Sequence, residues 1–366
     1  MKFTITRDAL LKPLQVIGGV VEKRQTLPIL SNVLLTLDGD RLTLTGTDLE
    51  VELTASTDLH GSETGEITLP ARKFVDICKS LPENAELSIT IEDNRALIRS
   101  GKSRFTLSTL PAHDFPSTEK ITGAREYTVP QSALKHLIDQ TQFCMANQDV
   151  RYYLNGLLLE LRPNTLRTVA TDGHRLALCD MECEIIPGDI NQIIVPRKGV
   201  VELSRLLSDT DSPCTIQLNA NHIRIDLGDI VFLSKLIDGR FPDYDRVIPR
   251  GGDKVVVANR DILRQSLLRA SILSNEKYRG IRMNFSNSLL RATVNNPEQE
   301  EAEEEIDIDY SGDELEIGFN VSYLVDALNA IKQNEVQLTL IDANSSCLIC
   351  GVGDQSSRYV VMPMRL

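Results

Sequence analysis

The stretch Ile67-Thr-Leu-Pro-Ala-Arg72 decides the fold, because two related stretches follow it at a nearly constant interval. They are Ile193-Ile-Val-Pro-Arg-Lys198 and Ile317-Gly-Phe-Asn-Val-Ser322. Each begins as a strand-like run and continues into a segment with apolar residues at helical spacing. The residues expected to face inward in these helices are Phe74, Ile77 and Leu81; Val200, Leu203 and Leu207; and Leu324, Leu328 and Ile331.

Other anchors recur in the same order, roughly 124 residues apart. Residues 3–10 return as 127–134 and more faintly as 256–263, and residues 107–110 return as 233–236. Each copy reads as strand, helix, several alternating strands, helix and several strands, joined by turns, which is typical of an α+β unit with antiparallel sheets. We therefore predict three tandem domains, at 1–124, 125–252 and 253–366.

The bulk composition excludes several classes of protein. The chain has 366 residues, 42% of them hydrophobic and 25% charged, as in an ordinary globular protein of two or three domains. It shows neither a signal peptide nor an apolar run long enough to span a bilayer, so we expect a cytoplasmic location and no membrane partner. The net charge of −13 means that any DNA-binding surface must concentrate positive charge locally.

Seven scattered cysteines favour a reducing compartment over a disulfide framework. Two close pairs, Cys179 with Cys183 and Cys347 with Cys350, could suggest zinc or redox chemistry. Their spacing and their apolar surroundings favour buried, inert thiols. We expect no metal and no cofactor.

A basic stripe recurs in register on the second helix of each repeat. Arg72 and Lys79 lie two helical turns apart, and Lys198 and Arg205 occupy the equivalent positions in the second repeat. The third repeat carries neutral residues there. A solvated face with random charge is the alternative. Repetition favours a surface that faces phosphates without reading bases.

An acidic run, Glu298-Gln-Glu-Glu-Ala-Glu-Glu-Glu-Ile-Asp307, lies inside the third repeat and is predicted to be an ordered strand. A basic counterpart lies in the first repeat, at Arg95, Arg99, Lys102 and Arg104. Opposite charges at the two ends predict a head-to-tail contact between chains, which closes into a ring if the rotation allows. Two chains would supply six similar domains.

Thr171-Asp-Gly-His-Arg175 could suggest a catalytic histidine, but no nucleophile elbow, phosphate-binding loop or zinc-protease motif accompanies it. Asp172-Gly173 is itself a hairpin-turn signal. We predict that the protein is not an enzyme. A hydrolase built on His174, and a scaffold that never meets DNA, are the alternatives. The methionine-rich end, residues 359–366, is either a last core strand or an adaptable pocket for peptides.

Several stretches closely resemble the bacterial replicative sliding clamps, the beta subunits of DNA polymerase III. The resemblance covers the whole chain. Its most specific parts are Thr26–Leu30, Ser103–Pro111, Gln148–Gly156, Thr171–Leu176, Asp238–Asp243, Asn295–Glu301 and the final Val360–Leu366. It implies a homodimeric head-to-tail ring around duplex DNA. It also implies a pocket between the second and third domains for short motifs of the polymerase, the clamp loader, other polymerases and repair proteins.

The resemblance also implies residue roles. DNA contacts would fall on Arg24, Arg72, Gln148, Tyr152 and Tyr153, to which the basic stripe adds Lys198 and Arg205. The peptide pocket would use Arg151, Leu154, Thr171, Gly173, His174, Arg175, Leu176, Pro242, Arg246, Val247, Asn320, Tyr323, Ser346, Val360, Val361, Met362, Pro363, Met364, Arg365 and Leu366. The interface between chains would use Lys73, Arg95, Arg104, Leu107, Ile272, Leu273, Glu298, Glu300, Glu301, Glu303 and Glu304.

Overall fold

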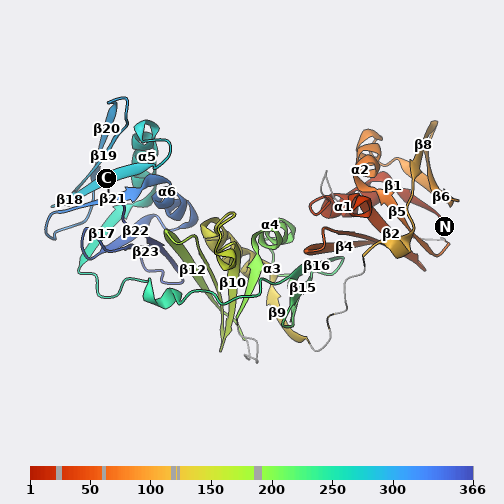
Figure 1. Ribbon diagram of the computed structural model, residues 1–366, viewed down its shortest axis with the longest axis horizontal. Coiled ribbons are helices and arrows are strands. Elements are labelled where there is room, and N and C mark those ends of the chain that lie inside the picture. The colour runs from red at the N-terminus through yellow and green to blue at the C-terminus, as the bar shows by residue number, and fades with distance from the viewer. Residues whose placement is uncertain (22–26, 60–62, 117–120, 122–123, 185–191, 366) are drawn as a thin grey trace. The chain divides into compact units, whose positions relative to one another are not determined.

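The computed structural model describes residues 1–21, 27–59, 63–116, 121, 124–184 and 192–365. The chain divides into two compact units, Met1–Ser132 with Val201–Leu236 and Ala133–Val200 with Ile237–Leu366. Each unit combines helices with sheets whose described strands pair in antiparallel fashion (Figure 1). The predicted α+β class is therefore confirmed.

The first unit contains two sheets. The four-stranded sheet has the order β1 (Lys2–Thr6), β6 (Glu86–Glu92), β7 (Arg95–Ser100) and β8 (Ser103–Ser108). The eight-stranded sheet has the order β5 (Gly65–Pro70), β2 (Asn32–Asp38), β3 (Arg41–Thr47), β4 (Val51–Asp58), β16 (Ile230–Lys235), β15 (His222–Asp226), β14 (Pro213–Leu218) and β9 (Arg125–Pro130). Helices α1 (Arg7–Ile17) and α2 (Ala71–Ser80) lie side by side, and α1 covers β3 and β4 (Figure 1).

The second unit repeats this plan. Its eight-stranded sheet has the order β13 (Gln192–Pro196), β10 (Gly156–Arg162), β11 (Thr165–Thr171), β12 (Arg175–Glu182), β24 (Ser357–Val361), β23 (Cys347–Gly351), β22 (Glu335–Leu340) and β17 (Lys254–Asn259). The four-stranded sheet has the order β20 (Glu301–Asp307), β19 (Leu289–Asn295), β18 (Gly280–Ser286) and β21 (Leu315–Asn320). Helices α5 (Arg260–Ala270) and α6 (Val321–Ala330) pack together, and α5 covers β19 and β20.

The remaining helices are two that run across a unit boundary and six short 3-10 turns in the described parts of the chain. The former are α3 (Gln131–Thr141) and α4 (Arg197–Leu206). The turns are η1 (Pro28–Ser31), η2 (Ala112–Asp114), η3 (Gln142–Cys144), η4 (Tyr152–Leu154), η5 (Tyr244–Arg246) and η6 (Ser271–Leu273).

Each eight-stranded sheet is shared by two consecutive sequence repeats. Strand β4 of the first repeat pairs with β16 of the second, and β12 of the second pairs with β24 of the third. Because the sheets are shared, the two compact units divide the second repeat between them. The repeat boundaries at 124/125 and 252/253 stay a prediction.

The helical periodicity identified the core faces well. Most of the inward residues predicted for the second helices are buried, as are Leu10, Leu14 and Ile17 on α1. The exception is Ile77, which is half-buried because the neighbouring Cys78 takes the fully buried position on α2. The acidic run forms strand β20 from Glu301 onward, as predicted. No helix in the described part of the chain is long and apolar enough to cross a membrane.

Candidate functional site

A small cavity of about 170 Å³ lies in the second unit. Four segments meet there: the turn between β11 and β12, the η4 turn, the segment around η5, and strand β24 with the residues after it. Its lining is Arg151, Tyr153, Leu154, Thr171, Gly173, Arg175, Leu176, Pro242, Tyr244, Val247, Val360 and Met362. Most of these side chains are apolar, and two arginines, the exposed Arg151 and the half-buried Arg175, complete the lining. The cavity can therefore take a short apolar side-chain cluster with polar contacts around it.

The β11–β12 turn is held in shape by its own residues. The Thr171 hydroxyl donates to the Arg175 carbonyl oxygen (2.7 Å), and the Gly173 N–H donates to the Thr171 hydroxyl oxygen (3.1 Å). Gly173 has a φ of +87°, and a Cβ there would lie 2.9 Å from the Arg151 guanidinium. Glycine is thus required both by the left-handed backbone and by the close approach of Arg151.

Arg175 ties this turn to α6. Its guanidinium donates to the carboxylates of Asp172 (3.1 Å) and Asp326 (2.5 Å) and to the Phe143 carbonyl oxygen (2.8 Å). It also lies 4.5 Å from the centre of the Tyr323 ring. Burial alone would lower the pKa of Arg175, but these acidic neighbours raise it. The arginine therefore serves as a fixed wall of the cavity.

A buried network lies beneath the cavity. The Tyr244 hydroxyl donates to Glu160 (2.5 Å), and Arg167 donates to the Tyr244 oxygen (3.2 Å). Arg167 also makes a two-pronged ion pair with Asp180, which Arg358 joins at 2.8 Å. Burial first, and then the Glu160 carboxylate, raise the pKa of Tyr244 to about 12. The network fixes Tyr244, and with it the η5 segment, against β10 and β11.

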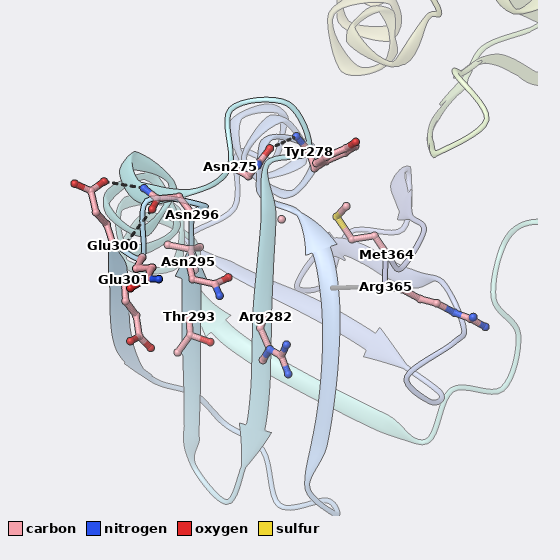
Figure 2. Close-up of a pocket in the computed structure, with 13 residues that line it drawn as sticks. Asn275, Tyr278, Arg282, Thr293, Asn295, Asn296, Glu300, Glu301, Met364 and Arg365 are labelled. Atoms are coloured by element: carbon pink, nitrogen blue, oxygen red, sulfur yellow. Dashed lines mark hydrogen bonds between the residues drawn. The ribbon is translucent and has the colours of Figure 1, made fainter.

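The C-terminal segment passes from this cavity to a second one. The Met362 N–H donates to the His174 carbonyl oxygen (2.9 Å), and the Met364 N–H donates to the Gly318 carbonyl oxygen (2.8 Å). Met362 lines the small cavity, whereas Met364 and Arg365 line a polar cavity of about 790 Å³ on the β18–β21 sheet (Figure 2). Both ends of the segment are thus held by the backbone.

A groove of about 530 Å³ in the first unit collects much of the predicted basic stripe. Arg72 and Lys79 of α2 line it together with Arg205, but so do Asp76 and Glu202. Arg205 donates to Glu202 (2.8 Å) and to the Val16 carbonyl oxygen at the end of α1 (3.0 Å). Arg205 thus satisfies the end of a helix, whereas Arg72 and Lys79 are exposed cations of the same groove.

The other predicted DNA contacts lie elsewhere. Gln148 lies in the loop before η4 and has a positive φ of 58°. Tyr152, the first residue of η4, is 57% exposed. Tyr153 packs edge-on against Tyr152 and lines the small cavity. Lys198 is in α4 and has an interaction partner of its own. Arg24 lies outside the described residues.

The predicted interface residues fall on two sheet edges. Arg95 and Arg104 lie on β7 and β8, and β8 is the edge of its sheet; Lys73 is exposed on α2. At the other end Glu301 and Glu303 lie on the edge strand β20, with Glu298 and Glu300 exposed in the turn before it. Glu304 differs, because Arg269 binds both of its oxygens (2.6 and 2.8 Å).

The apolar part of this predicted contact is more uneven than the sequence suggested. Ile272 is 76% exposed, and Leu268 one turn earlier is 41% exposed, whereas Leu273 is half-buried. Leu107 is only 8% exposed. Phe105, two residues earlier on the same face of β8, is half-buried and is the more accessible apolar side chain.

The small cavity brings together half of the predicted pocket residues. Those outside its lining are His174, Arg246, Asn320, Tyr323, Ser346, Val361, Pro363, Met364 and Arg365, while Leu366 lies outside the described residues. The sequence did not identify Tyr244 as a lining residue, and it predicted Tyr153 as a DNA contact without placing it in this cavity. A signal for Tyr244 existed in Glu160 and Arg167, charged residues that stand directly opposite each other on two apolar strands.

The alternative chemistries find little support in the site. Six cysteines are buried, and burial raises the pKa of Cys179 to about 11, which keeps that thiol protonated. Among the described residues no cluster of three or more metal-binding side chains occurs. His174 is exposed, and the Asp172 carboxylate is engaged by Arg175 and by the backbone N–H of His174.

Successive α+β repeats that share sheets, with open sheet edges and a small, mostly apolar cavity, are the features of a clamp-type protein. Three family models match the chain: the N-terminal, central and C-terminal domains of the DNA polymerase III beta subunit, at residues 1–119, 128–243 and 245–365.

Full-length relatives agree with these matches. The chain is 58% identical to the beta sliding clamp of Pseudomonas aeruginosa, with 100% of both chains covered. The crystal structure of the DNA polymerase III subunit beta from that organism has a TM-score of 0.98 and 57% identity, again with both chains fully covered. Another structure of that clamp, bound to griselimycin, has a TM-score of 0.97 and 58% identity with the same full coverage. The chain therefore belongs to the family of DNA polymerase III beta subunits, the beta sliding clamps. As a member of that family it is a polymerase processivity factor.

Proposed function

We propose that two copies of the chain join head to tail into a ring that surrounds duplex DNA and tethers the replicative polymerase. The ring has no catalytic role and works in the cytoplasm. The polymerase, the clamp loader, other polymerases and repair proteins dock in turn at the small cavity, and each chain supplies one cavity. The sheet topology carries this proposal.

The strand order leaves two edges open that match the closed junctions. Strands β4, β12 and β20 are equivalents in the three repeats, and so are β8, β16 and β24. Within one chain β4 pairs with β16, and β12 pairs with β24, while β8 and β20 stand at the edges of their sheets. An exposed edge strand is a ready template for another strand. Pairing of β20 with β8 of a second chain would repeat the same junction a third time.

The charges on the two edges support the same register. Extending the β4–β16 and β12–β24 register places Glu303 opposite Arg104 of the second chain. Within its own sheet Arg104 stands directly opposite Arg99, a like-charge pair that costs stability. A glutamate arriving from the second chain relieves that repulsion. Heterologous contacts of this kind close into rings when the rotation allows.

Exposed cations on α2, rather than the whole surface, would meet the DNA. Arg72 and Lys79 are exposed, and acidic Asp76 and Glu202 share their groove. Contacts to phosphates carry no sequence information. A few of them, partly offset by acid, give weak, salt-sensitive binding that permits sliding.

Retention on circular DNA tests the ring. Labelled protein loaded onto nicked circular duplex should stay bound, and a single restriction cut should release it through the free ends. Equal retention on circular and linear DNA would rule out encirclement. Gel filtration of the complexes before and after the cut measures this directly.

A charge swap tests the proposed closure. Arg104→Glu and Glu303→Arg should each raise the dimer dissociation constant about tenfold, because like charges would then face each other. Combining both changes should restore the dimer. Sedimentation velocity over a dilution series measures the effect, and a double variant no better than either single one would contradict this register.

A further inference from the structure

A second and larger cavity in the second unit lies outside the docking site. It measures about 790 Å³ and occupies the face of the β18–β21 sheet that α5 does not cover. Residues alternate along these strands, so that Ile281 and Met283 are buried in the core while Arg282 faces the cavity. Arg282 and Thr293 stand directly opposite each other on β18 and β19 and form its floor.

The lining of this cavity is polar and has charges of opposite sign at its two ends. Figure 2 shows Glu300 and Glu301 on one side and Arg365 on the other. Between them lie Thr293 and Asn295, whose side chains have no hydrogen-bond partner among the described residues. Amide and hydroxyl groups suit the backbone of an extended polypeptide, and the charged ends suit side chains of opposite sign.

The C-terminal segment connects this cavity to the docking site. Met362 lines the small cavity, and Met364 and Arg365 line the large one. Two extended residues span roughly 7 Å. Hydrogen bonds to the carbonyl oxygens of His174 and Gly318 hold the segment at both ends. A polypeptide that leaves the small cavity along this segment reaches the large one within a few residues.

We propose that the large cavity binds the charged polypeptide segment that flanks a partner's docking motif. An acidic side chain of that segment pairs with Arg365, and a basic side chain further along pairs with Glu300 and Glu301. The inference rests on the proposed function of the small cavity. The small cavity then provides the shared apolar contact, and the large one discriminates between partners by the charge order of their flanking residues.

A cavity-filling substitution tests this. Thr293→Tyr places a ring in the large cavity, and the strand should tolerate it because tyrosine is favoured in sheets. Asn284→Tyr is the matched control, since Asn284 lies on the same face of β18 but does not line the cavity. The probes are two fluorescein-labelled synthetic peptides, one with an apolar docking motif alone and one that adds a flanking segment with an acidic residue followed by a basic residue.

Thr293→Tyr in the full-length ring should weaken binding of the longer peptide about tenfold and leave the motif peptide unchanged. Asn284→Tyr should affect neither. Arg365→Glu should likewise weaken binding of the longer peptide, and replacing the acidic residue designed to pair with Arg365 by lysine should restore that binding.

Equal affinity of wild type and Thr293→Tyr for the longer peptide would overturn the inference. A rise in the dimer dissociation constant of Thr293→Tyr, with peptide binding intact, would also overturn it, because a second copy would then cover this face. Failure of the proposed function itself shows differently: Val247→Asp in the small cavity would leave binding of the motif peptide unchanged.

Discussion

The small cavity of the second unit and the helix groove of the first use charge in opposite ways. Beneath the apolar lining of the cavity lies a network of buried charged residues, in which Arg167 binds Asp180 and the Tyr244 hydroxyl donates to Glu160. In the groove, Arg72 and Lys79 stay exposed at the surface of α2. Buried charged groups are fixed in pairs and stiffen the site. Exposed charged groups can still contact a mobile, highly charged ligand.

Under the proposed function, this difference follows from what each surface has to do. A docking site must hold its partner's side chains in one arrangement, and paired buried charges fix that arrangement because any displacement leaves a charge unpaired. A surface that slides along DNA must avoid such a preferred position. Exposed cations in water interact weakly and are screened by salt, so they hold DNA near without fixing its register.

The largest effect is expected when the buried network around Arg167 is disrupted. Arg167→Met leaves the carboxylate of Asp180 with Arg358 alone and removes one hydrogen-bond donor from the Tyr244 oxygen, and we expect the free energy of unfolding to fall by about 3 kcal/mol. The affinity for a motif peptide should fall as well, because Tyr244, which lines the small cavity, is then held only by Glu160 and Arg162. Arg162→Met is the matched control, since Arg162 contacts the same Glu160 and Tyr244 but is more exposed. Urea unfolding should show a loss below about 1 kcal/mol for the control; equal losses would mean that the network does not depend on burial.

The second test places a charge on the apolar surface itself. Val247→Asp puts a carboxylate into the small cavity, where an apolar partner would leave it without hydrogen bonds. We expect about 30-fold weaker binding of the motif peptide, equivalent to about 2 kcal/mol. Because Val247 is half-buried, the fold should survive. The matched control is Val255→Asp, the same substitution on β17 at a residue that is 43% exposed and does not line the cavity. It should leave peptide binding unchanged in the same fluorescence titration.

The parts of this architecture that repeat were predictable from the sequence. Periodic apolar residues such as Leu263 and Leu267 identify a helix face, and the recurrence of Pro70 and Pro196 before the second helices aligns the copies. The helix prediction failed only at Ile77, where two adjacent apolar residues compete for one buried position and Cys78 occupies it. Periodicity cannot choose between such neighbours.

The site was less predictable than the fold. The buried network joins Glu160, Arg167 and Asp180, on three strands, to Tyr244. Tyr244 lies in a segment whose apolar residues show neither helical nor strand periodicity. Spacing along the chain does not tell how close such segments lie in space. The network could be recognised only once the residues that stand opposite each other on neighbouring strands were known. For the same reason the sequence could not show that the guanidinium of Arg205, a predicted DNA contact, also binds the end of α1.

A third test compares two arginines of the helix groove, Arg72 and Arg205. Arg72→Gln should weaken DNA binding several-fold and reduce the slope of log affinity against log salt by about 1, because one phosphate contact is lost. Arg205→Gln should change that slope less and should instead cost roughly 0.5 kcal/mol of stability through the lost helix-end contact. Fluorescence anisotropy with a short duplex over a salt series separates the two. Equal slopes for the two variants would show that Arg205 contacts phosphate despite its ties to Glu202 and Val16.

The smallest expected effect concerns an exposed pair at the rim of the docking cavity. Hydrogen bonds from Arg151 hold the pKa of Asp149 at about 2. The folded pKa is lower than the unfolded value of about 3.9, so the pair stabilises the fold above that value, and its contribution is lost as the pH falls towards 2. Asp149→Asn should therefore show a flatter dependence of the unfolding midpoint on pH between about 4 and about 2 than the wild type. If the wild type and Asp149→Asn gave parallel curves of unfolding midpoint against pH, the pair would not stabilise the fold. Arg151 would then not be held beside Gly173 by Asp149, and the charges at the rim would be as weakly paired as those of the groove.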